Sequence, residues 1–218
     1  NQSFGLLVDA GTSSSDYAAE FRKADNTTIM RIRGDGNVGV GQSSPDTLLH
    51  LAGADTAVIR LENTDSSLGA NQLIGGVEFE KTDGSGAGAG VVGGMRMKSD
   101  GSVGEATYLA FSTSSSSTND VEALRIDGSG NVGINRTSPN GLLHIQSDAG
   151  SNAQLYVQTG DTSTKSQLIF GDSGDSNTGG VQYDHSDDSL QFHVGNLGEA
   201  ARIDSSQNFL VGTTDSTP

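Results

Sequence analysis

Two acidic side chains near the middle of the chain have a spacing that suits glycoside cleavage. Glu78 and Glu80 are two residues apart, which on a strand places both carboxylates on one face, about 6.6 Å apart. Glycosidases need two carboxylates about 5–10 Å apart. The neighbouring Lys81 favours a charged, solvated face instead. The sequence also holds neither a Gly-x-Ser-x-Gly nucleophile motif nor a phosphate-binding loop, so we expect no catalytic residue and no enzymatic activity.

Other residues have the chemistry of metal ligands. The run from Asp127 to Asn131 resembles the start of a calcium loop. Val132 and Ser138, however, occupy the positions at which such a loop needs a glycine and a carboxylate. We therefore favour a hairpin turn. A second acidic group leaves an ion site open as an alternative, and it consists of Asp172, Asp175, Asp184, Asp187 and Asp188.

His50 and His144 occupy the same position in two copies of a repeat. On the axis of a symmetric assembly, such histidines would form a ring able to bind a transition metal. We favour the alternative, in which each is a half-buried strand residue that bonds a neighbouring backbone group. His185 and His193 lack the paired spacing of metal ligands. We therefore predict neither a metal nor a cofactor.

An arginine recurs in every copy of the repeat, an isoleucine follows it each time, and an aspartate comes next in the second and third copies. The recurring pair predicts hydrogen bonds between the guanidinium and carboxylate groups of different subunits, which would fix their register. The predicted structural positions are Arg31, Ile32, Asn37, Arg125, Ile126, Asp127, Asn131, Arg202, Ile203, Asp204 and Asn208.

These positions belong to a long repeat. Residues 124–145 read LRIDGSGNVGINRTSPNGLLHI, and residues 30–51, 94 positions earlier, read MRIRGDGNVGVGQSSPDTLLHL. A third, weaker copy, ARIDSSQNFLVGTTDSTP, begins at residue 201. A long period that returns to one short motif is typical of a modular array. We place the first module at residues 1–50, the second at 51–141 and the third at 142–218.

Each copy of the repeat predicts a β-hairpin. In the second copy, Leu124 and Ile126 alternate with polar residues, residues 127–131 reverse the chain, and alternation resumes at Val132. Pro139 ends the ladder, and residues 142–145 begin another strand. Short strands with Gly, Asn and Asp turns every 8–12 residues indicate an all-β protein.

Alternating apolar residues predict further strands. Near the start they lie at residues 4–8 and 17–21, and the second of these competes with an amphipathic helix over residues 16–24. Two consecutive glycines, Gly75 and Gly76, predict a β-bulge. The other strands are expected at residues 57–61, 74–79, 91–97, 108–111, 155–157, 181–183 and 190–194.

The composition limits how one chain can fold. The 218 residues carry a net charge of −15 and include 31 glycines. Leu, Ile, Val and Phe make up about 22 per cent, just above the roughly 20 per cent below which charged chains tend toward disorder. Ordering each residue costs roughly 1–2 kcal/mol, which so few apolar residues barely offset. Because the apolar residues nevertheless alternate regularly, we expect identical chains to share one core.

The composition also excludes several partners. Without cysteine the chain forms neither disulfides nor thiolate metal sites. Its acidic balance argues against nucleic acid, which binds mainly to Lys and Arg, and it holds no run of eighteen apolar residues that would insert into a membrane. Because the first residue is Asn and no signal peptide is visible, we expect an excised or processed piece.

The repeated motifs resemble the shaft modules of bacteriophage tail fibres. The hairpin sequence, the T-S-P turn and the L-L-H-I strand carry this resemblance, together with DGSGAGAG at residues 83–90 and FSTSSSSTND at residues 111–120. The resemblance implies an all-β, elongated homotrimeric fibre of tandem β-hairpin and β-sandwich-like modules, located on the virion and therefore extracellular. The implied partners are identical chains and other virion tail proteins. A host cell-surface glycan or protein is left open as a further contact.

We therefore expect a structural role as a tail-fibre shaft, which acts by reach and by presenting several copies of a surface at once. One alternative is a glycan-binding receptor-recognition module, although 4 Tyr and no Trp leave few platforms on which sugars stack. A second is a polysaccharide-cleaving tailspike, which needs acidic pairs in a groove. A third is an extracellular β-rich filament or adhesin.

Overall fold

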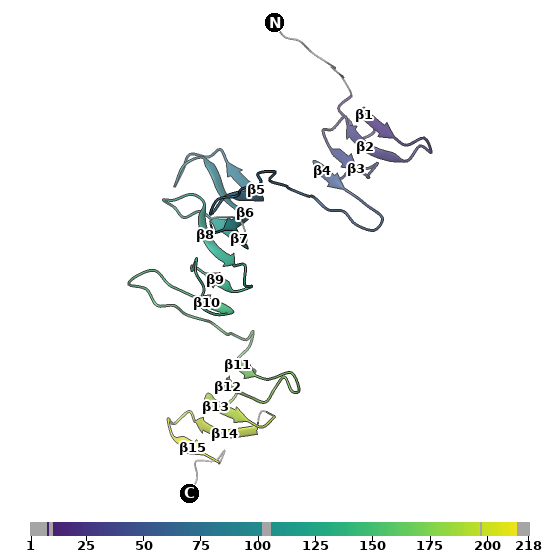
Figure 1. The fold of residues 1–218 in the computed structure, drawn as a ribbon. Coiled ribbons are helices and arrows are strands. Elements are labelled where there is room, and N and C mark those ends of the chain that lie inside the picture. The colour runs from purple at the N-terminus through teal and green to yellow at the C-terminus, as the bar shows by residue number, and fades with distance from the viewer. Residues whose placement is uncertain (1–7, 9–10, 102–105, 197, 213–218) are drawn as a thin grey trace. The chain divides into compact units, whose positions relative to one another are not determined.

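The described part of the chain is built only from strands and the turns between them. The computed structural model describes residues 8, 11–101, 106–196 and 198–212, and these form fifteen strands and no helix (Figure 1). The strands make three sheets, so the all-β prediction is confirmed. The first sheet has the strand order β1 (Tyr17–Arg22), β2 (Thr28–Arg33), β3 (Val38–Val40) and β4 (Leu49–Leu51).

The second and third sheets follow along the chain, each with neighbouring strands in sequence order. The second contains β5 (Leu73–Lys81), β6 (Gly90–Asp100), β7 (Ala106–Thr113), β8 (Val121–Ile126), β9 (Val132–Ile134) and β10 (Leu143–Ile145). The third contains β11 (Lys165–Phe170), β12 (Gly179–Asp184), β13 (Ser189–Val194), β14 (Gly198–Ile203) and β15 (Phe209–Val211). The strand β10 lies beside β9, whereas the sequence places residues 142–145 at the start of the third module. The limits of the modules stay a prediction.

The three copies of the repeat form the same hairpin, as predicted. The paired strands are β2 with β3, β8 with β9 and β14 with β15. Their registers are equivalent: Met30 is opposite Val40, Leu124 is opposite Ile134, and Ala201 is opposite Val211. The first backbone N–H of each turn donates to the carbonyl oxygen four residues later, at Asn37, Asn131 and Asn208. The asparagines that the sequence singles out therefore close the turns.

One position in each of these turns has a left-handed backbone. The φ angle is 92° at Gly36, 82° at Gly130 and 68° at Gln207. Glycine adopts this conformation freely, whereas any other residue pays about 1–2 kcal/mol. The third hairpin therefore contains backbone strain that the first two avoid.

Replacing Gln207 with glycine is expected to stabilise the protein by about 1 kcal/mol, because relief of strain outweighs the greater freedom of glycine in the unfolded chain. The free energy of unfolding in urea measures the effect. The reverse change at the equivalent position, Gly130→Gln, is expected to destabilise by a similar amount. A Gln207→Gly variant that is less stable than the parent would contradict this interpretation.

A second glycine in each of the first two copies makes room for the returning chain. A Cβ atom on Gly39 would lie 2.1 Å from the backbone oxygen of Gln42, and one on Gly133 would lie 2.0 Å from that of Arg136. Since no side chain fits there, the chain can fold tightly over the end of the hairpin. In the first copy it then buries Pro45 and returns as β4, which pairs with β3 in parallel.

Each sheet has an apolar face and a polar face, and the polar face is the better buried. Apart from Pro45, the described hydrophobic residues that are buried are Tyr108 and Ala110, at 2% and 6% exposure. The buried polar residues are more numerous: Arg96, Ser99, Arg125, Gln182, Asp184, Ser189 and Gln191. A protein that folds alone places its large apolar residues inside. The apolar faces of this chain are therefore at most partly covered when it stands alone.

Two strands that the alternation predicts do not form in the described chain. Residues 57–61 and 155–157 belong to no sheet, and their apolar side chains are exposed, at 77% for Val58 and 68% for Leu155. These predictions were wrong for the single chain because a strand also needs a partner for its N–H and C=O groups, which alternation does not reveal.

Three further local predictions concern residues 16–24, the bulge near Gly75 and residues 4–8. The strand β1 occupies Tyr17–Arg22, so the alternative of a helix over residues 16–24 is wrong. A register shift between Leu73 and Gly75 places a bulge at Ile74, one residue before the two glycines at which it was expected, and Gly75 and Gly76 are themselves regularly paired. The strand expected at residues 4–8 lies outside the described residues, apart from Val8, which belongs to no strand.

Candidate assembly interface

The apolar face of the second sheet is made of two rows of side chains that cross the strands. Alternate residues of a strand point to the same face, and the pairing register aligns them from strand to strand. The first row contains Val77, Met95, Phe111, Leu124 and Ile134. The second row contains Gly75, Met97, Leu109, Ile126 and Val132. Such rows form half of a hydrophobic core.

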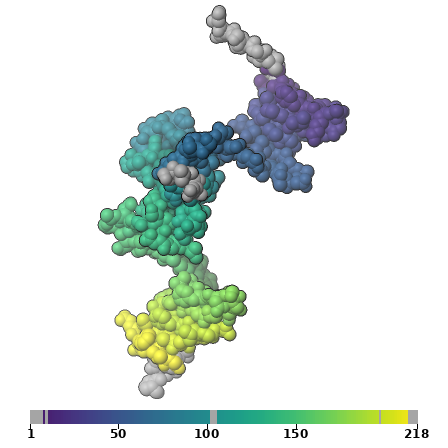
Figure 2. Space-filling model, viewed as in Figure 1, coloured from purple at the N-terminus to yellow at the C-terminus, as the bar shows by residue number. Residues whose placement is uncertain are grey.

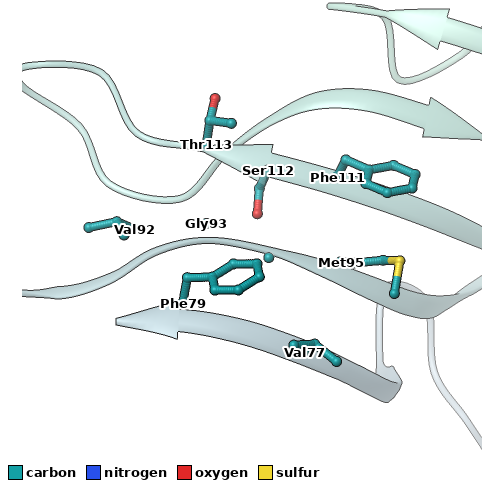
Figure 3. Close-up of a pocket in the computed structure, with 9 residues that line it drawn as sticks. Val77, Phe79, Val92, Gly93, Met95, Phe111, Ser112 and Thr113 are labelled. Atoms are coloured by element: carbon teal, nitrogen blue, oxygen red, sulfur yellow. The ribbon is translucent and has the colours of Figure 1, made fainter. Parts of the chain in front are cut away.

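The described chain covers this face only in part, where Ala57, Ile59 and Leu61 border a hollow beside Gly75, Met97 and Leu109 of the second row. Met95 is 43% exposed and Phe79, at the end of β5, is 62% exposed. Here the face is hollowed into a groove of about 570 Å³. Figure 3 shows Val77 and Phe79 on one strand, Met95 on the next and Phe111 on the third. An exposed apolar surface of this kind marks an interaction site.

The first and third sheets have the same rows. In the first sheet the register aligns Phe21, Met30, Val40 and Leu51. In the third sheet it aligns Leu168, Val181, Phe192, Ala201 and Val211, with a second row of Tyr183, Leu190, Ile203 and Phe209. Every sheet of the described chain therefore presents one apolar face that is at most partly covered.

Large apolar side chains are exposed in each of the three sheets. Phe21 of the first is 56% exposed, Phe79 of the second 62% and Phe209 of the third 65%. Figure 2 shows atoms of all three sheets at the surface, from the purple first sheet to the yellow third sheet.

On the polar face of the second sheet, Arg96 connects several strands. Its Nε donates to Oε1 of Glu78 at 2.8 Å, and its Nη1 donates to Oγ of Ser112 at 2.8 Å and to Oδ1 of Asp120 at 2.7 Å. The carboxylate of Asp120, and then that of Glu78, raises the pKa of Arg96. Glu78 is therefore half of an ion pair within a network that joins β5 to the neighbouring strands.

The recurring arginine is held by a glutamate of its own chain. Arg125 donates to both carboxylate oxygens of Glu122, at 2.7 and 2.9 Å, and its guanidinium lies 3.7 Å from the centre of the Tyr108 ring. Arg202 likewise donates to both oxygens of Glu199, each at 2.6 Å. Ion pairs with two parallel hydrogen bonds have a strongly fixed geometry. Each of these ion pairs lies within one strand, β8 or β14, and fixes the position of its arginine. Arg125 also reaches the neighbouring strand, because the Tyr108 ring belongs to β7.

The first copy has the same arrangement with residues from different strands. Nε of Arg31 donates to Oε1 of Glu20 on β1 at 3.0 Å, and the guanidinium lies 4.2 Å from the centre of the Tyr17 ring. Sequence reasoning missed these glutamates and tyrosines. A signal was present for Glu122 and Glu199, since each precedes its arginine by three residues. No spacing rule points to Glu20, which lies on another strand.

Within the single chain, the aspartate that follows the recurring arginine caps the turn. Oδ1 of Asp127 accepts the N–H groups of Ser129 and Asn131, both at 2.9 Å. Asp204 accepts the equivalent N–H groups of Ser206 and Asn208, at 3.0 and 2.9 Å. The N–H of Asn131, the largest contribution, lowers the pKa of Asp127. The resemblance to a calcium loop is thus explained by a turn that binds its own carboxylate.

The polar face of the third sheet carries a chain of hydrogen bonds across its strands. The amide of Gln167 donates to Gln182 at 2.6 Å, and the amide of Gln182 donates to Gln191. Gln191 then donates to Ser189 at 2.7 Å, and Ser189 donates to Asp187 at 2.6 Å. Because each buried polar group finds a partner, this face needs no further cover.

The histidine and acidic candidates have partners within the chain. Nδ1 of His50 lies 2.8 Å from Oδ1 of Asp46, and Nδ1 of His144 accepts the N–H of Asn140 at 3.3 Å. In the acidic group, Asp172 accepts N–H groups of its own loop, and Asp184 bonds Ser186 and Lys165. Among the residues that the structure describes, no three His, Asp or Glu side chains gather as a metal site. No helix suited to crossing a membrane occurs in the described ranges.

The ion pairs of Glu20 predict a dependence of stability on pH. Hydrogen bonds, of which that from Arg22 is the largest, lower the pKa of Glu20 from 4.5 to about 2. A lowered pKa means that the ionised carboxylate stabilises the folded state. This contribution is complete above pH 4.5 and is lost as the pH falls toward 2.

A Glu20→Gln variant is therefore expected to be less stable than the parent at pH 7, with a deficit that shrinks steadily below pH 4.5. Unfolding in urea at pH 7, 4 and 2.5 measures this deficit. A deficit of equal size at all three pH values would show that charge plays no part in the role of Glu20.

No protein-family model matches the sequence, and no curated protein matches it either. Among solved structures, the chain is similar to the carboxy-terminal domain of the bacteriophage T5 L-shaped tail fibre. The identity is 12% and the TM-score 0.36, over 75% of this chain and 88% of that chain. It is also similar to that domain with its intra-molecular chaperone domain, at 11% identity and a TM-score of 0.36, over 75% of this chain and 61% of that one.

Proposed function

We propose that this chain is a structural component of a bacteriophage tail fibre, in which three copies assemble by covering one another's apolar faces. The single observation that carries the proposal is that every described sheet joins a tail-fibre-like hairpin motif to an uncovered row of apolar side chains. We infer an assembly of three chains from the resemblance of the motifs to tail-fibre shafts. We infer that chains must assemble at all from the exposed apolar faces.

The energetic reason for assembly is the burial of these rows. Removing a large aliphatic or aromatic side chain from water contributes about 1.5–3 kcal/mol, and the first row of the second sheet alone has five such residues. A closed three-fold arrangement satisfies identical faces without leaving one open. The net charge of −15 on each chain then lies on the outside and keeps assembled particles apart.

We propose a mechanical role, not an enzymatic one. The acidic residues that resemble catalytic or metal-binding groups already serve turns and ion pairs, as with Asp127, Glu78 and Asp120. A shaft of this kind works by holding its ends apart and by presenting three copies of any terminal contact surface, which raises avidity without new contacts.

Electron microscopy of the purified protein tests the proposal. Thin rods of uniform width are expected, and compact particles would contradict the fibre. Glycan-binding and polysaccharide-degradation assays on the same material separate the alternatives. A fibre shaft is expected to be inactive in both, whereas specific glycan binding would favour a receptor-recognition module and depolymerisation would favour a tailspike.

A further inference from the structure

The segment Ala57–Leu61 has the sequence of a strand but no partner in the described chain. Ala57, Ile59 and Leu61 alternate with Val58 and Arg60, and none of the five belongs to a sheet. The side chains of Val58 and Ile59 are 77% and 64% exposed. Leaving a strand-like apolar segment in water is unfavourable, both for its side chains and for its backbone.

The third module also contains an apolar, alternating segment that belongs to no sheet, so this feature is repeated along the chain. Leu155 and Val157 alternate around Tyr156, and all three are exposed outside any sheet. In both modules the unpaired segment precedes the edge strand of a sheet, β5 in one case and β11 in the other. The sequence Gln-Leu-Ile occurs at both of these edges, from Gln72 just before β5 and from Gln167 within β11.

Arg60 has neither a hydrogen-bond partner nor an ion-pair partner among the described residues of its own chain. Among the described residues, each of the other seven arginines has a hydrogen bond or an ion pair, whereas Arg60 has neither. On the edge strand β5, Glu80 also lacks an ion-pair partner among the described residues. An unpaired cation on the segment and an unpaired anion on the edge are complementary charges.

The edge strand β5 has an unpaired side with which another strand can pair. Its outer N–H and C=O groups face no neighbouring strand, and such an edge is a template for another strand. Val77 and Phe79 point to the apolar face, above the groove of about 570 Å³, while Glu78 and Glu80 point to the polar face. A strand beside β5 with Ile59 toward the groove necessarily turns Arg60 toward the glutamates.

On its own sheet the segment lies over the apolar face, where Ala57, Ile59 and Leu61 border a hollow with Gly75, Val77 and Met97, and it forms no strand beside β5. Leu61 already lies against the apolar face at Gly75, since a Cβ on that glycine would be 2.6 Å from Cβ of Leu61. Glu80 is five residues farther along β5, which corresponds to about 16 Å. Arg60 and Glu80 of one chain are therefore too far apart to be neighbours across a pair of strands.

We infer that the segment Ala57–Leu61 of one copy pairs with the edge strand β5 of a second copy, with Ile59 over Val77 and Phe79 and with Arg60 beside Glu80. The segment around Tyr156 pairs in the same way with β11. This inference rests on the proposed assembly of identical chains and adds which segment crosses between them. The two strands absent from the single chain are then strands between chains.

Engineered disulfides test the exchange directly, because the chain has no cysteine of its own. The variant Arg60→Cys/Glu80→Cys is oxidised and run on a denaturing gel without reductant. Since a disulfide needs Cα atoms within about 7 Å, the expected product is chains covalently linked to one another. The matched control is Arg60→Cys/Lys98→Cys, whose second thiol lies opposite Leu73 at the other end of the sheet, and it is expected to stay unlinked, as are the two single-cysteine variants.

Hydrogen exchange of the unaltered protein provides the second measurement. Amide protons of residues 57–61 are expected to exchange about a hundredfold more slowly than in a free peptide, because strand pairing protects them. The mass of the assembly is determined on the same samples. If the chains assemble but form no disulfide between positions 60 and 80, or if the amides of residues 57–61 are unprotected, the strand pairing between copies is overturned and the proposed function stands. If the chains remain single, both are overturned.

Discussion

Replacing Phe111 with aspartate is expected to leave the protein as single chains at concentrations at which the parent assembles. Phe111 lies in the middle of the first apolar row, between Met95 and Leu124, and lines the groove in Figure 3. In a three-fold assembly one substitution places three carboxylates in the shared core. Each buried charge without a partner costs several kcal/mol, and the roughly 1.5–3 kcal/mol contributed by burial of the Phe111 ring is lost as well.

Sedimentation velocity at several protein concentrations measures this result. The matched control is Thr82→Asp, which adds the same charge at an exposed position just beyond β5, and it is expected to assemble like the parent. If Phe111→Asp assembles as well as Thr82→Asp, the apolar face of the second sheet is not the contact surface.

Replacing Gly133 with alanine is expected to destabilise the protein by about 3 kcal/mol, at the upper end of the range for an overpacked site. A Cβ at this position would lie 2.0 Å from the backbone oxygen of Arg136. Because that atom belongs to the backbone, the clash cannot be relieved by rotating a side chain. The loop after β9 has to move, and the N–H of Val132 then loses its bond to the carbonyl of Leu142.

Unfolding in urea gives the loss of stability, and limited proteolysis within residues 136–142 reports the displaced loop. The control is Gly141→Ala in the same loop, where a Cβ would have no atom within 4 Å, and a change below about 0.5 kcal/mol is expected there. Equal effects of the two substitutions would mean that close packing at Gly133 does not matter.

The hairpins could be predicted because everything that makes them is local. Leu124 and Ile126 show the face, the residues 127–131 provide the turn, and the same pattern returns in each copy. The bulge next to Gly75 is local for the same reason. The parallel pairing of β4 with β3 was not predictable, since it depends on a tight return of the chain over Gly39.

The candidate interface was predictable in kind but not in detail. Alternation shows that Val77 and Met95 each lie on an apolar face, but only the register shows that they stand side by side. The composition predicts that one chain has too few apolar residues for a core of its own. That polar residues such as Gln191 and Arg96 occupy the better-buried face could be seen only in the structure. For residues 57–61 the alternation predicts a strand, but it does not show which strand would pair with it.

The mass of the protein in solution tests the central claim most directly. Sedimentation equilibrium of the unaltered chain is expected to give three times the 22.3 kDa of one chain, unchanged on dilution across the micromolar range. A stable, folded particle with the mass of a single chain would contradict the account, because the apolar faces would then remain in water.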